Sequence, residues 1–300
     1  MKTSTIHVVH VVGSINIDHV YRLSHLPAAG ETLATLGYLR TLGGKGANQA
    51  IAAARAGARV RMIGAVGDDG RWTLEQLAGA GIDVAHVRTV TAATGHALIE
   101  LDARGENRII VHAGANHELE PAVIREALSS AEPGDWLLLQ NETNQVVEAA
   151  ALGRALGLRV AYSAAPFDAA AVEALLPELD LLAVNEIEAA ALAARFGRDV
   201  ALLPVPVRLV TAGAAGARWY QGDEVVSVPA WPVAVVDTTG AGDVFLGHLI
   251  GALALGLSRD EALSRASAAA ALQVGRLGAA AAIPTVDEVE ALRATRESRR

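Results

Sequence analysis

Asp237-Thr238-Thr239-Gly240-Ala241-Gly242-Asp243 is the stretch that decides the fold and the chemistry of this 300-residue chain. We expect the apolar pair before it, Val235-Val236, to belong to a strand, and the apolar run 244–257 after it to form a helix. A glycine-containing turn at a helix start can direct several backbone N–H groups at one anion. A carboxylate beside such a site suits phosphoryl transfer to an alcohol, with Asp243 as general base. The turn lacks the G-x-x-x-x-G-K-[ST] pattern, which excludes a Walker-type nucleotide site.

Composition narrows the class of protein. The chain is 52% hydrophobic, carries a formal net charge of −8 at pH 7 and has no cysteine. A nucleic-acid-binding protein would show a basic face, so we expect no nucleic-acid partner. We expect no membrane partner either, because no apolar run is long enough to span a bilayer and no signal peptide is evident. The absence of cysteine fits a reducing compartment, and we expect a cytoplasmic protein.

Strand-like and helix-like segments alternate along most of the chain. This alternation predicts an α/β fold with a mostly parallel sheet covered by helices. The expected strands are residues 6–12, 60–66, 136–139, 159–162, 179–184 and 207–211, and the expected helices include 47–56, 72–80, 258–274 and 286–296.

Two stretches do not follow this alternation. Residues 16–40 show no sustained helical period, and runs 97–101 and 108–111 alternate like an antiparallel hairpin. We therefore expect a core formed by residues 1–14, 41–93 and 113–300, and a small β unit formed by 15–40 and 94–112.

Polar residues follow several of the expected strands, and in open α/β sheets that is the edge where ligands bind. Asp243 has a helix N-cap as its alternative role, although the Gly-Ala-Gly before it favours catalysis. Lys45 is one of two lysines, and its flanking glycines favour a ligand site over a solvated surface position. Asp18 has two alternative roles: it either accepts hydrogen bonds from a polyol or forms a turn.

Two further patterns have structural alternatives. Asn185 and Glu188 lie three residues apart at an expected helix start, where they suit either a hydrated Mg²⁺ or a capping box. Thr211, Gly213 and Gly216 suit either close approach to a nucleotide or an ordinary turn. No H-E-x-x-H or G-x-S-x-G pattern is present, which argues against a zinc enzyme and an α/β-hydrolase.

Four motifs carry a resemblance that covers nearly the whole chain. They are Gly13-Ser14-Ile15-Asn16-Ile17-Asp18, Gly43-Gly44-Lys45-Gly46-Ala47-Asn48-Gln49-Ala50, His112-Ala113-Gly114-Ala115-Asn116 and the stretch 237–243. They resemble the ribokinase family, also called the phosphofructokinase B family of carbohydrate kinases. The resemblance implies a three-layer α/β/α core with a mostly parallel central sheet and a small β-sheet lid. It also implies an ATP- and Mg²⁺-dependent sugar kinase whose lid covers the sugar and forms a homodimer contact.

The same resemblance assigns roles to single residues. Asp243 is the base, and the backbone of Gly240, Ala241 and Gly242 forms the anion hole. The sugar-binding positions are Asn16, Asp18, Gly44, Lys45, Asn48, Glu142 and Asp243. The nucleotide positions are Asn185, Thr211, Gly213, Gly216 and Gly242. Mg²⁺ is held through water by Asn185 and Glu188, and a monovalent cation, K⁺, is held around Asp237, Thr239 and Gly278.

The sequence departs from the family pattern on the nucleotide side. Ser163-Ala164-Ala165-Pro166 replaces an Asn-Pro-Ala-Pro motif, and Ser267 replaces a histidine near the adenine. Ala282 replaces a serine near the cation loop, which leaves the K⁺ requirement open. Thirteen residues separate Gly197 from Thr211, where relatives have an extra helix.

These observations favour a kinase that converts D-ribose to D-ribose 5-phosphate. The alternative substrates are fructose, another ketose or keto-sugar, or a nucleoside. The alternative class is a non-catalytic regulator that binds a sugar or nucleotide on the same fold. A dinucleotide-dependent oxidoreductase lacks support, because no G-x-G-x-x-G follows the first strand.

Overall fold

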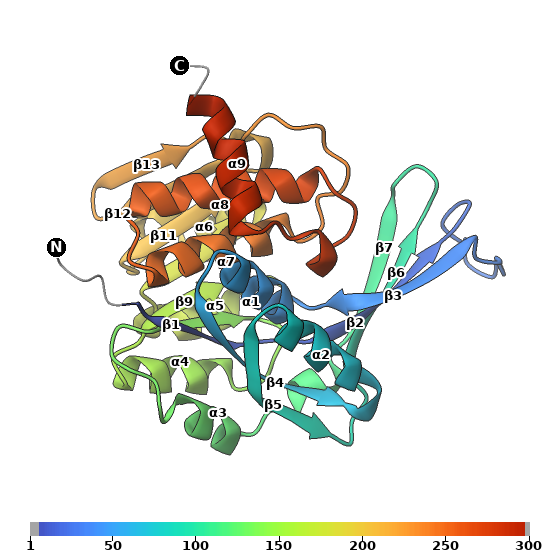
Figure 1. The fold of residues 1–300 in the computed structure, drawn as a ribbon, viewed down its shortest axis with the longest axis horizontal. Coiled ribbons are helices and arrows are strands. Elements are labelled where there is room, and N and C mark those ends of the chain that lie inside the picture. The colour runs from blue at the N-terminus through green and yellow to red at the C-terminus, as the bar shows by residue number, and fades with distance from the viewer. Residues whose placement is uncertain (1–5, 298–300) are drawn as a thin grey trace.

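A large sheet forms the middle of three layers (Figure 1). The computed structural model describes residues 6–297, and within that range the sheet has nine strands in the order β13-β12-β11-β10-β9-β8-β1-β4-β5. The strands from β11 to β5 are parallel, and β12 and β13 form an antiparallel hairpin at one edge. The bounds are β1 Val8–Val12, β4 Arg59–Gly67, β5 Ile82–Val90, β8 Trp136–Gln140, β9 Arg159–Ser163, β10 Leu181–Asn185, β11 Val207–Thr211, β12 Ala217–Gln221 and β13 Glu224–Val228.

Helices cover both faces of this sheet because its central strands are apolar on both sides. Val11 and Leu138 pack into one hydrophobic core, whereas Val12 and Leu139 pack into the other. The first core is closed by α1 Lys45–Arg55, α2 Arg71–Gly79, α7 Ala241–Ala254, α8 Arg259–Val274 and α9 Val286–Glu297. The second core is closed by α3 Pro121–Leu128, α4 Val146–Ala155, α5 Ala169–Leu175 and α6 Glu186–Phe196. The predicted α/β/α class is confirmed.

A second sheet projects from this core, at the right of Figure 1. Its strands are β2 Asn16–Arg22, β3 Gly37–Gly43, β6 Gly95–Leu101 and β7 Asn107–His112, in the order β3-β2-β6-β7. The expected hairpin is present as β6–β7, while β2 pairs parallel with β6, so the projecting sheet is mixed. The division of the chain into core and lid stays a prediction, and residues 1–5 and 298–300 of the expected core lie outside the described residues.

Some elements differ from the sequence-based expectation. Val235-Val236 is not a strand: it is an extended segment with 66% and 60% of its two side chains exposed, held by hydrogen bonds from Val236 N and Asp237 N to Val274 O. Strands β5, β12 and β13 were not predicted. They lie at the two edges of the sheet, where mixed burial weakens the apolar pattern.

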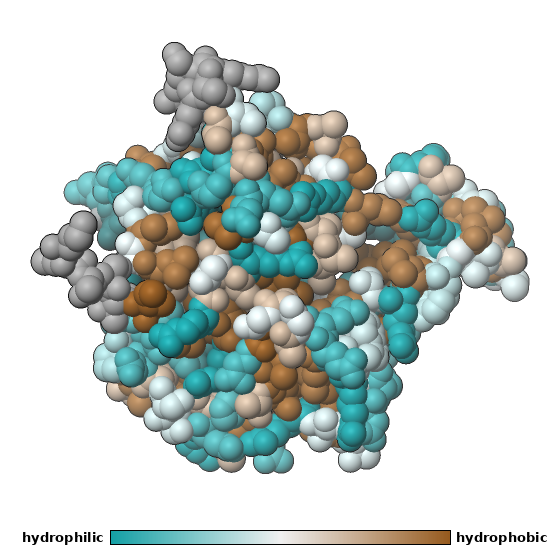
Figure 2. Space-filling model, viewed as in Figure 1, coloured by the Kyte–Doolittle hydropathy of each residue, from teal (hydrophilic) through white to brown (hydrophobic). Residues whose placement is uncertain are grey.

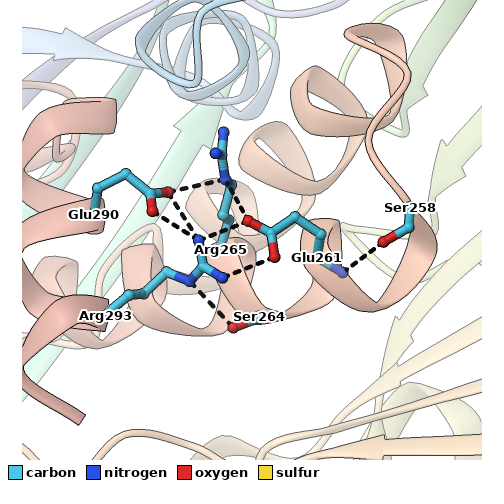
Figure 3. A network of polar contacts seen from close by, with 6 residues as sticks. All are labelled: Ser258, Glu261, Ser264, Arg265, Glu290 and Arg293. Carbon is cyan, nitrogen blue, oxygen red and sulfur yellow. Dashed lines mark hydrogen bonds and ion pairs between the residues drawn. The ribbon is translucent and has the colours of Figure 1, made fainter. Parts of the chain in front are cut away.

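An ion-pair network fixes α9 on α8 (Figure 3). Arg293 donates to both carboxylate oxygens of Glu261, at 2.8 and 2.9 Å, and also binds Glu290 on its own helix. Arg265 contacts Glu261 and Glu290 as well. Partners shared among several charges make such a network more stabilising than isolated surface pairs, so α9 is fixed to the N-terminal half of α8.

None of the helices in residues 6–297 combines the length and the apolar character that a membrane span needs.

Candidate active site

The 237–243 stretch turns into the first turn of α7. Gly240 is the N-cap residue, with φ +73°, and Ala241 is the first helical residue. The helix therefore begins three residues earlier than expected, and Asp243 is its third residue rather than its N-cap. Backbone N–H groups in a first helical turn have no carbonyl partner within the helix. A helix start of this kind can bind an anion, and the expected anion hole beside Asp243 stays a prediction. The N–H of Ala241, one of its expected groups, donates to Thr238 O at 3.2 Å in this structure.

Asp243 is buried and oriented by α1. Its carboxylate accepts hydrogen bonds from Gln49 Nε2 at 2.8 Å and Asn48 Nδ2 at 3.4 Å, and only 8% of the residue is exposed. Burial raises the pKa of Asp243, and the charge of Lys45 and the bond from Gln49 partly oppose that rise. A carboxylate with a raised pKa is a more effective general base than one with an ordinary pKa.

Glycines allow α1 and α7 to approach closely. A Cβ on Gly247 would lie 2.5 Å from Ala52 Cβ, and one on Gly251 would lie 2.8 Å from Ala53 O. Both distances are too short for any residue but glycine. This close approach allows the side chains of Asn48 and Gln49 to reach Asp243.

Lys45 carries the positive charge of the site. The charge of Asp243 raises the pKa of Lys45 most, against the lowering effect of burial, and Glu142 and Glu188 add to the rise. The backbone N–H of Lys45 also donates to Glu142 Oε2 at 3.0 Å. Lys45, Glu188 and Asp243 line one cavity of about 230 Å³. The structure therefore brings together a buried carboxylate, a lysine side chain and the α7 N-terminus.

Asp18 and Asn16 lie on β2, at the root of the projecting sheet. Asp18 is 9% exposed, and burial together with the charge of Glu142 raises its pKa to about 7. Asn16 Oδ1 accepts a bond from Asn116 Nδ2 at 2.7 Å. Within the described part of the chain, the buried Oδ1 of Asn48 has no hydrogen-bond partner. Buried polar atoms are normally paired, so an unpaired acceptor here fits a site that receives hydroxyl groups.

Close backbone packing shapes the same region. Gly44 has φ +93°, and a Cβ there would lie 2.9 Å from Ser14 O and Asn16 N. A Cβ on Gly43 would lie 2.0 Å from Asp18 Oδ2. The glycines before Lys45 are therefore needed to seat β3 against β2 beside Asp18.

A second cavity, of about 460 Å³, adjoins the first at the α7 N-terminus. Thr211, Thr238 and Gly242 line both cavities. Gly213 and Gly216 line the second, whose other walls are largely apolar: Ala230, Trp231, Pro232, Val233, Val235, Ala270, Ala271 and Val274. Ser267 also lines it and donates its hydroxyl to Pro229 O at 2.9 Å. An apolar pocket beside an anion site has the shape and chemistry for a nucleoside attached to phosphates.

Asn185 and Glu188 form the capping box that was the structural alternative for them. Glu188 N donates to Asn185 Oδ1 at 2.9 Å, and Asn185 N donates to Glu188 Oε2 at 2.8 Å. The capping box uses Oε2 of Glu188 and leaves its Oε1 outside the box. Glu188 also lines the smaller cavity. Mg²⁺ in proteins keeps several waters and needs few carboxylates, so these residues also fit a hydrated Mg²⁺.

The residues expected to hold K⁺ are already bonded to one another. Asp237 Oδ1 accepts from the N–H and hydroxyl of Thr239, and Oδ2 accepts from Gly278 N at 3.0 Å. Burial alone would raise the pKa of Asp237, but these hydrogen bonds bring its pKa below the ordinary value. The amide of Gln273 donates to the carbonyls of Thr239 and Gly278. These residues do not fit a bound cation in this arrangement.

Sequence reasoning missed the residues that position others. Gln49 orients Asp243, and Gln140 in turn donates to Gln49 Oε1 at 2.7 Å. Asn116 orients Asn16. Gln49 and Asn116 lie within the quoted motifs, and Gln273 is a polar residue in an otherwise apolar helix end, which is the signal that identifies it.

Comparison with known proteins agrees with this geometry. Residues 7–286 match the pfkB family of carbohydrate kinases, and the chain belongs to that family of sugar kinases.

Curated relatives are similar over nearly their whole length. The chain is 37% identical to a ribokinase of Bacillus subtilis, covering 94% of this chain and 98% of the relative. It is 36% identical to a ribokinase of Haemophilus influenzae, covering 93% and 95%. A solved structure of Arabidopsis thaliana ribokinase complexed with ribose and ATP is 29% identical, with a TM-score of 0.81 over 96% of this chain and 98% of that one.

Proposed function

We propose that this sugar kinase transfers a phosphoryl group from ATP to D-ribose and forms D-ribose 5-phosphate. The observation that carries the proposal is the position of Asp243, a buried carboxylate held by Asn48 and Gln49 on the helix turn that separates two adjoining cavities. The similarity to ribokinases over nearly the whole chain supports ribose as the acceptor and ATP as the donor.

The reaction follows from this arrangement. Asp243 takes the proton of the primary hydroxyl, the freed oxygen forms a bond to the γ-phosphorus, and the bond from that phosphorus to the leaving oxygen of ADP breaks. The backbone N–H groups of residues 240–242 stabilise charge on the transferring group, and the ammonium of Lys45 adds to that stabilisation. Asn185 and Glu188 would hold Mg²⁺ through water, and the ion would supply positive charge to the nucleotide phosphates.

The remaining polar residues divide between the two substrates. On the sugar side, the hydroxyl groups bind Asn16, Asp18, Lys45, Asn48 and Glu142, with the backbone of Gly44 close to the ring. On the nucleotide side, Thr211, Gly213, Gly216 and Gly242 approach ATP, with Asn185 near its phosphates.

We place the enzyme in the cytoplasm, for which the absence of cysteine is the support.

We also propose a homodimer formed through the projecting sheet. The register puts Asp18, Ala97 and Val111 on one face of that sheet. The same face carries the apolar side chains of Val20, Leu39, Ile99 and Ile109, of which Leu39 and Ile109 are at least half exposed. An apolar face of this kind marks an interface more often than a free surface.

The test is a coupled ADP-release assay with ATP and Mg²⁺. The sugars are ribose, deoxyribose, fructose, adenosine, pseudouridine and 2-keto-3-deoxygluconate. Release that depends on ribose, with the highest kcat/KM of the panel, is the expected result. Turnover of another member alone would keep the mechanism and change the substrate. Binding of ribose or ATP without any turnover would favour the non-catalytic regulator.

A further inference from the structure

The side-chain amide of Gln273 lies among three backbone carbonyls. Gln273 is on the last turn of α8 and is fully buried. Its Nε2 lies 3.1 Å from Thr239 O, 2.8 Å from Gly278 O and 3.2 Å from Ala279 O. A primary amide has only two N–H hydrogens, so one nitrogen serves three acceptors that belong to two separate segments. Carbonyl oxygens that converge in this way form the environment that proteins offer to a desolvated K⁺ ion.

Other donors of the chain bind the neighbouring carbonyls. Arg276 Nη1 donates to Ala282 O at 3.3 Å, and Arg55 Nη1 donates to Ile283 O. Two guanidinium groups thus bind carbonyls of the segment that follows Ala279, and Arg276 is also paired with Glu288 at 2.6 Å. The carbonyls of Gly278, Ala279, Ala282 and Ile283 thus accept from N–H groups of the protein itself, while the buried Oε1 of Gln273 has no hydrogen-bond partner among the described residues.

Gln273 and its neighbour Val274 hold the segment 236–239, which leads into the first turn of α7. Val274, the next residue of α8, accepts hydrogen bonds from Val236 N at 2.7 Å and Asp237 N at 3.2 Å. Gln273 holds Thr239, the residue before the N-cap Gly240. Two consecutive residues of one helix thus hold both ends of the segment that leads into the catalytic turn.

We propose that Gln273 is a positioning residue whose amide replaces a monovalent cation, so that this enzyme needs no K⁺. The proposal rests on the sugar-kinase function proposed above. The partly positive hydrogens of the amide bind the three carbonyl oxygens and orient them, as the charge of a bound cation would. The catalytic turn is then ordered by the fold alone and does not depend on the ionic composition of the medium.

The experiment compares wild type with Gln273→Ala in potassium chloride, in sodium chloride and in tetramethylammonium chloride at equal ionic strength. Wild type should release ADP at the same rate in all three. The variant should lose at least about tenfold in kcat without K⁺, because the turn loses its anchor, and should recover most of it with K⁺. Gln273→Met fills the same space without a donor, so its loss should not be restored by K⁺.

A second measurement does not depend on turnover. K⁺ should raise the melting temperature of Gln273→Ala and leave that of wild type unchanged, because only the variant has carbonyls free to bind the ion. If wild type released no ADP with any sugar, the proposed function would fail, and the melting temperatures would still test Gln273. Stimulation of wild type by K⁺ of several-fold would overturn the proposal. So would a Gln273→Ala variant that keeps full activity without K⁺, or one that K⁺ neither reactivates nor stabilises.

Discussion

At the scale of single residues, the site depends on carboxylates that are kept out of water. Asp243 and Asp18 are both buried, and both have a raised pKa because desolvation penalises the charged form. Only Asp243 has a nearby cation, Lys45, and donors from Gln49 and Asn48 that favour its ionised form. The two carboxyl groups therefore differ in environment, which suits one to act as a base and the other to bind sugar hydroxyls.

Asp243→Asn should lower kcat by about 10²- to 10⁴-fold, the usual contribution of a general base, while sugar binding stays close to that of wild type. Asparagine keeps the shape of the side chain but cannot take the proton. The measurements are ADP release and calorimetric titration of ribose. Asp223→Asn, on the exposed turn between β12 and β13, is the matched control and should behave as wild type. Turnover of Asp243→Asn near the wild-type rate would exclude Asp243 as the base.

Asp18 should make both stability and sugar affinity depend on pH. Its pKa is about 7 in the folded protein against an ordinary 3.8, so between these values the native state holds a proton that the unfolded state has lost. This group therefore lowers the free energy of unfolding as pH rises through that window. Between pH 3.8 and about pH 7, wild type should therefore lose stability relative to Asp18→Asn, which has no carboxyl group to ionise at this position. The measurement is the difference in melting temperature, variant minus wild type, which should increase as the pH rises through this range.

Ribose should bind wild type more tightly as pH rises toward 7, by up to about tenfold per pH unit, because its hydroxyl groups donate to the ionised carboxylate. This dependence should disappear in Asp18→Asn. A wild-type affinity that does not change with pH in this range would show that Asp18 does not accept bonds from the sugar.

At the scale of elements, two helices bring the site together. α1 carries Lys45, Asn48 and Gln49, α7 carries Asp243, and Gly247 and Gly251 allow the two helices to touch. The sequence identified the residues of both helix starts, because their glycine motifs are local. It could not identify the contact between them, because Gly247 reads as an ordinary helical glycine until the residue opposite it, Ala52, is known.

The same reason explains the other differences between sequence and structure. Val235-Val236 looks like a strand by composition, but no strand within residues 6–297 pairs with it, and Val274 of α8 accepts hydrogen bonds from Val236 N and Asp237 N instead. The role of Gln273 depends on carbonyls that are distant in sequence, at Thr239, Gly278 and Ala279. Local patterns predict elements and ligand-binding turns, whereas the partners of buried polar groups depend on tertiary packing.

Gly247→Ala should separate α1 from α7. Its new Cβ would lie 2.5 Å from Ala52 Cβ, so the helices must shift, which should cost about 1–3 kcal/mol of stability and lower kcat as Asp243 moves from Gln49. Urea unfolding and ADP release measure the two effects. The control is Gly79→Ala on α2, where the new Cβ meets no atom within 4 Å. This substitution should raise the free energy of unfolding by up to about 1 kcal/mol, because alanine loses less conformational entropy than glycine in a helix. Wild-type stability and activity in Gly247→Ala would show that the helix contact does not set the site.

At the scale of the whole molecule, the proposed sugar site and the proposed dimer contact lie on one face of the projecting sheet. One face carries Asp18 and the apolar residues Ile99, Ile109 and Val111. The other mixes polar and apolar side chains: His19, Arg40, Tyr38, Leu98 and Ile110. Figure 2 shows hydrophobic residues gathered on this sheet, away from the core. The face that borders the sugar site is thus also the one that a second copy would bury, so dimer formation would restrict the movement of the sheet over the sugar.

Ile109→Asp should therefore dissociate the dimer, because an unpaired charge in an apolar interface costs several kcal/mol. Sedimentation equilibrium measures the effect. Ile110→Asp is the matched control: Ile110 pairs with Leu98 on the opposite face and is exposed to a similar degree, 58% against 50% for Ile109. The control should remain a dimer and keep its affinity for ribose, whereas Ile109→Asp should become monomeric and bind ribose more weakly. A monomeric wild type, or dissociation by Ile110→Asp alone, would place the interface elsewhere and remove the link between assembly and sugar binding.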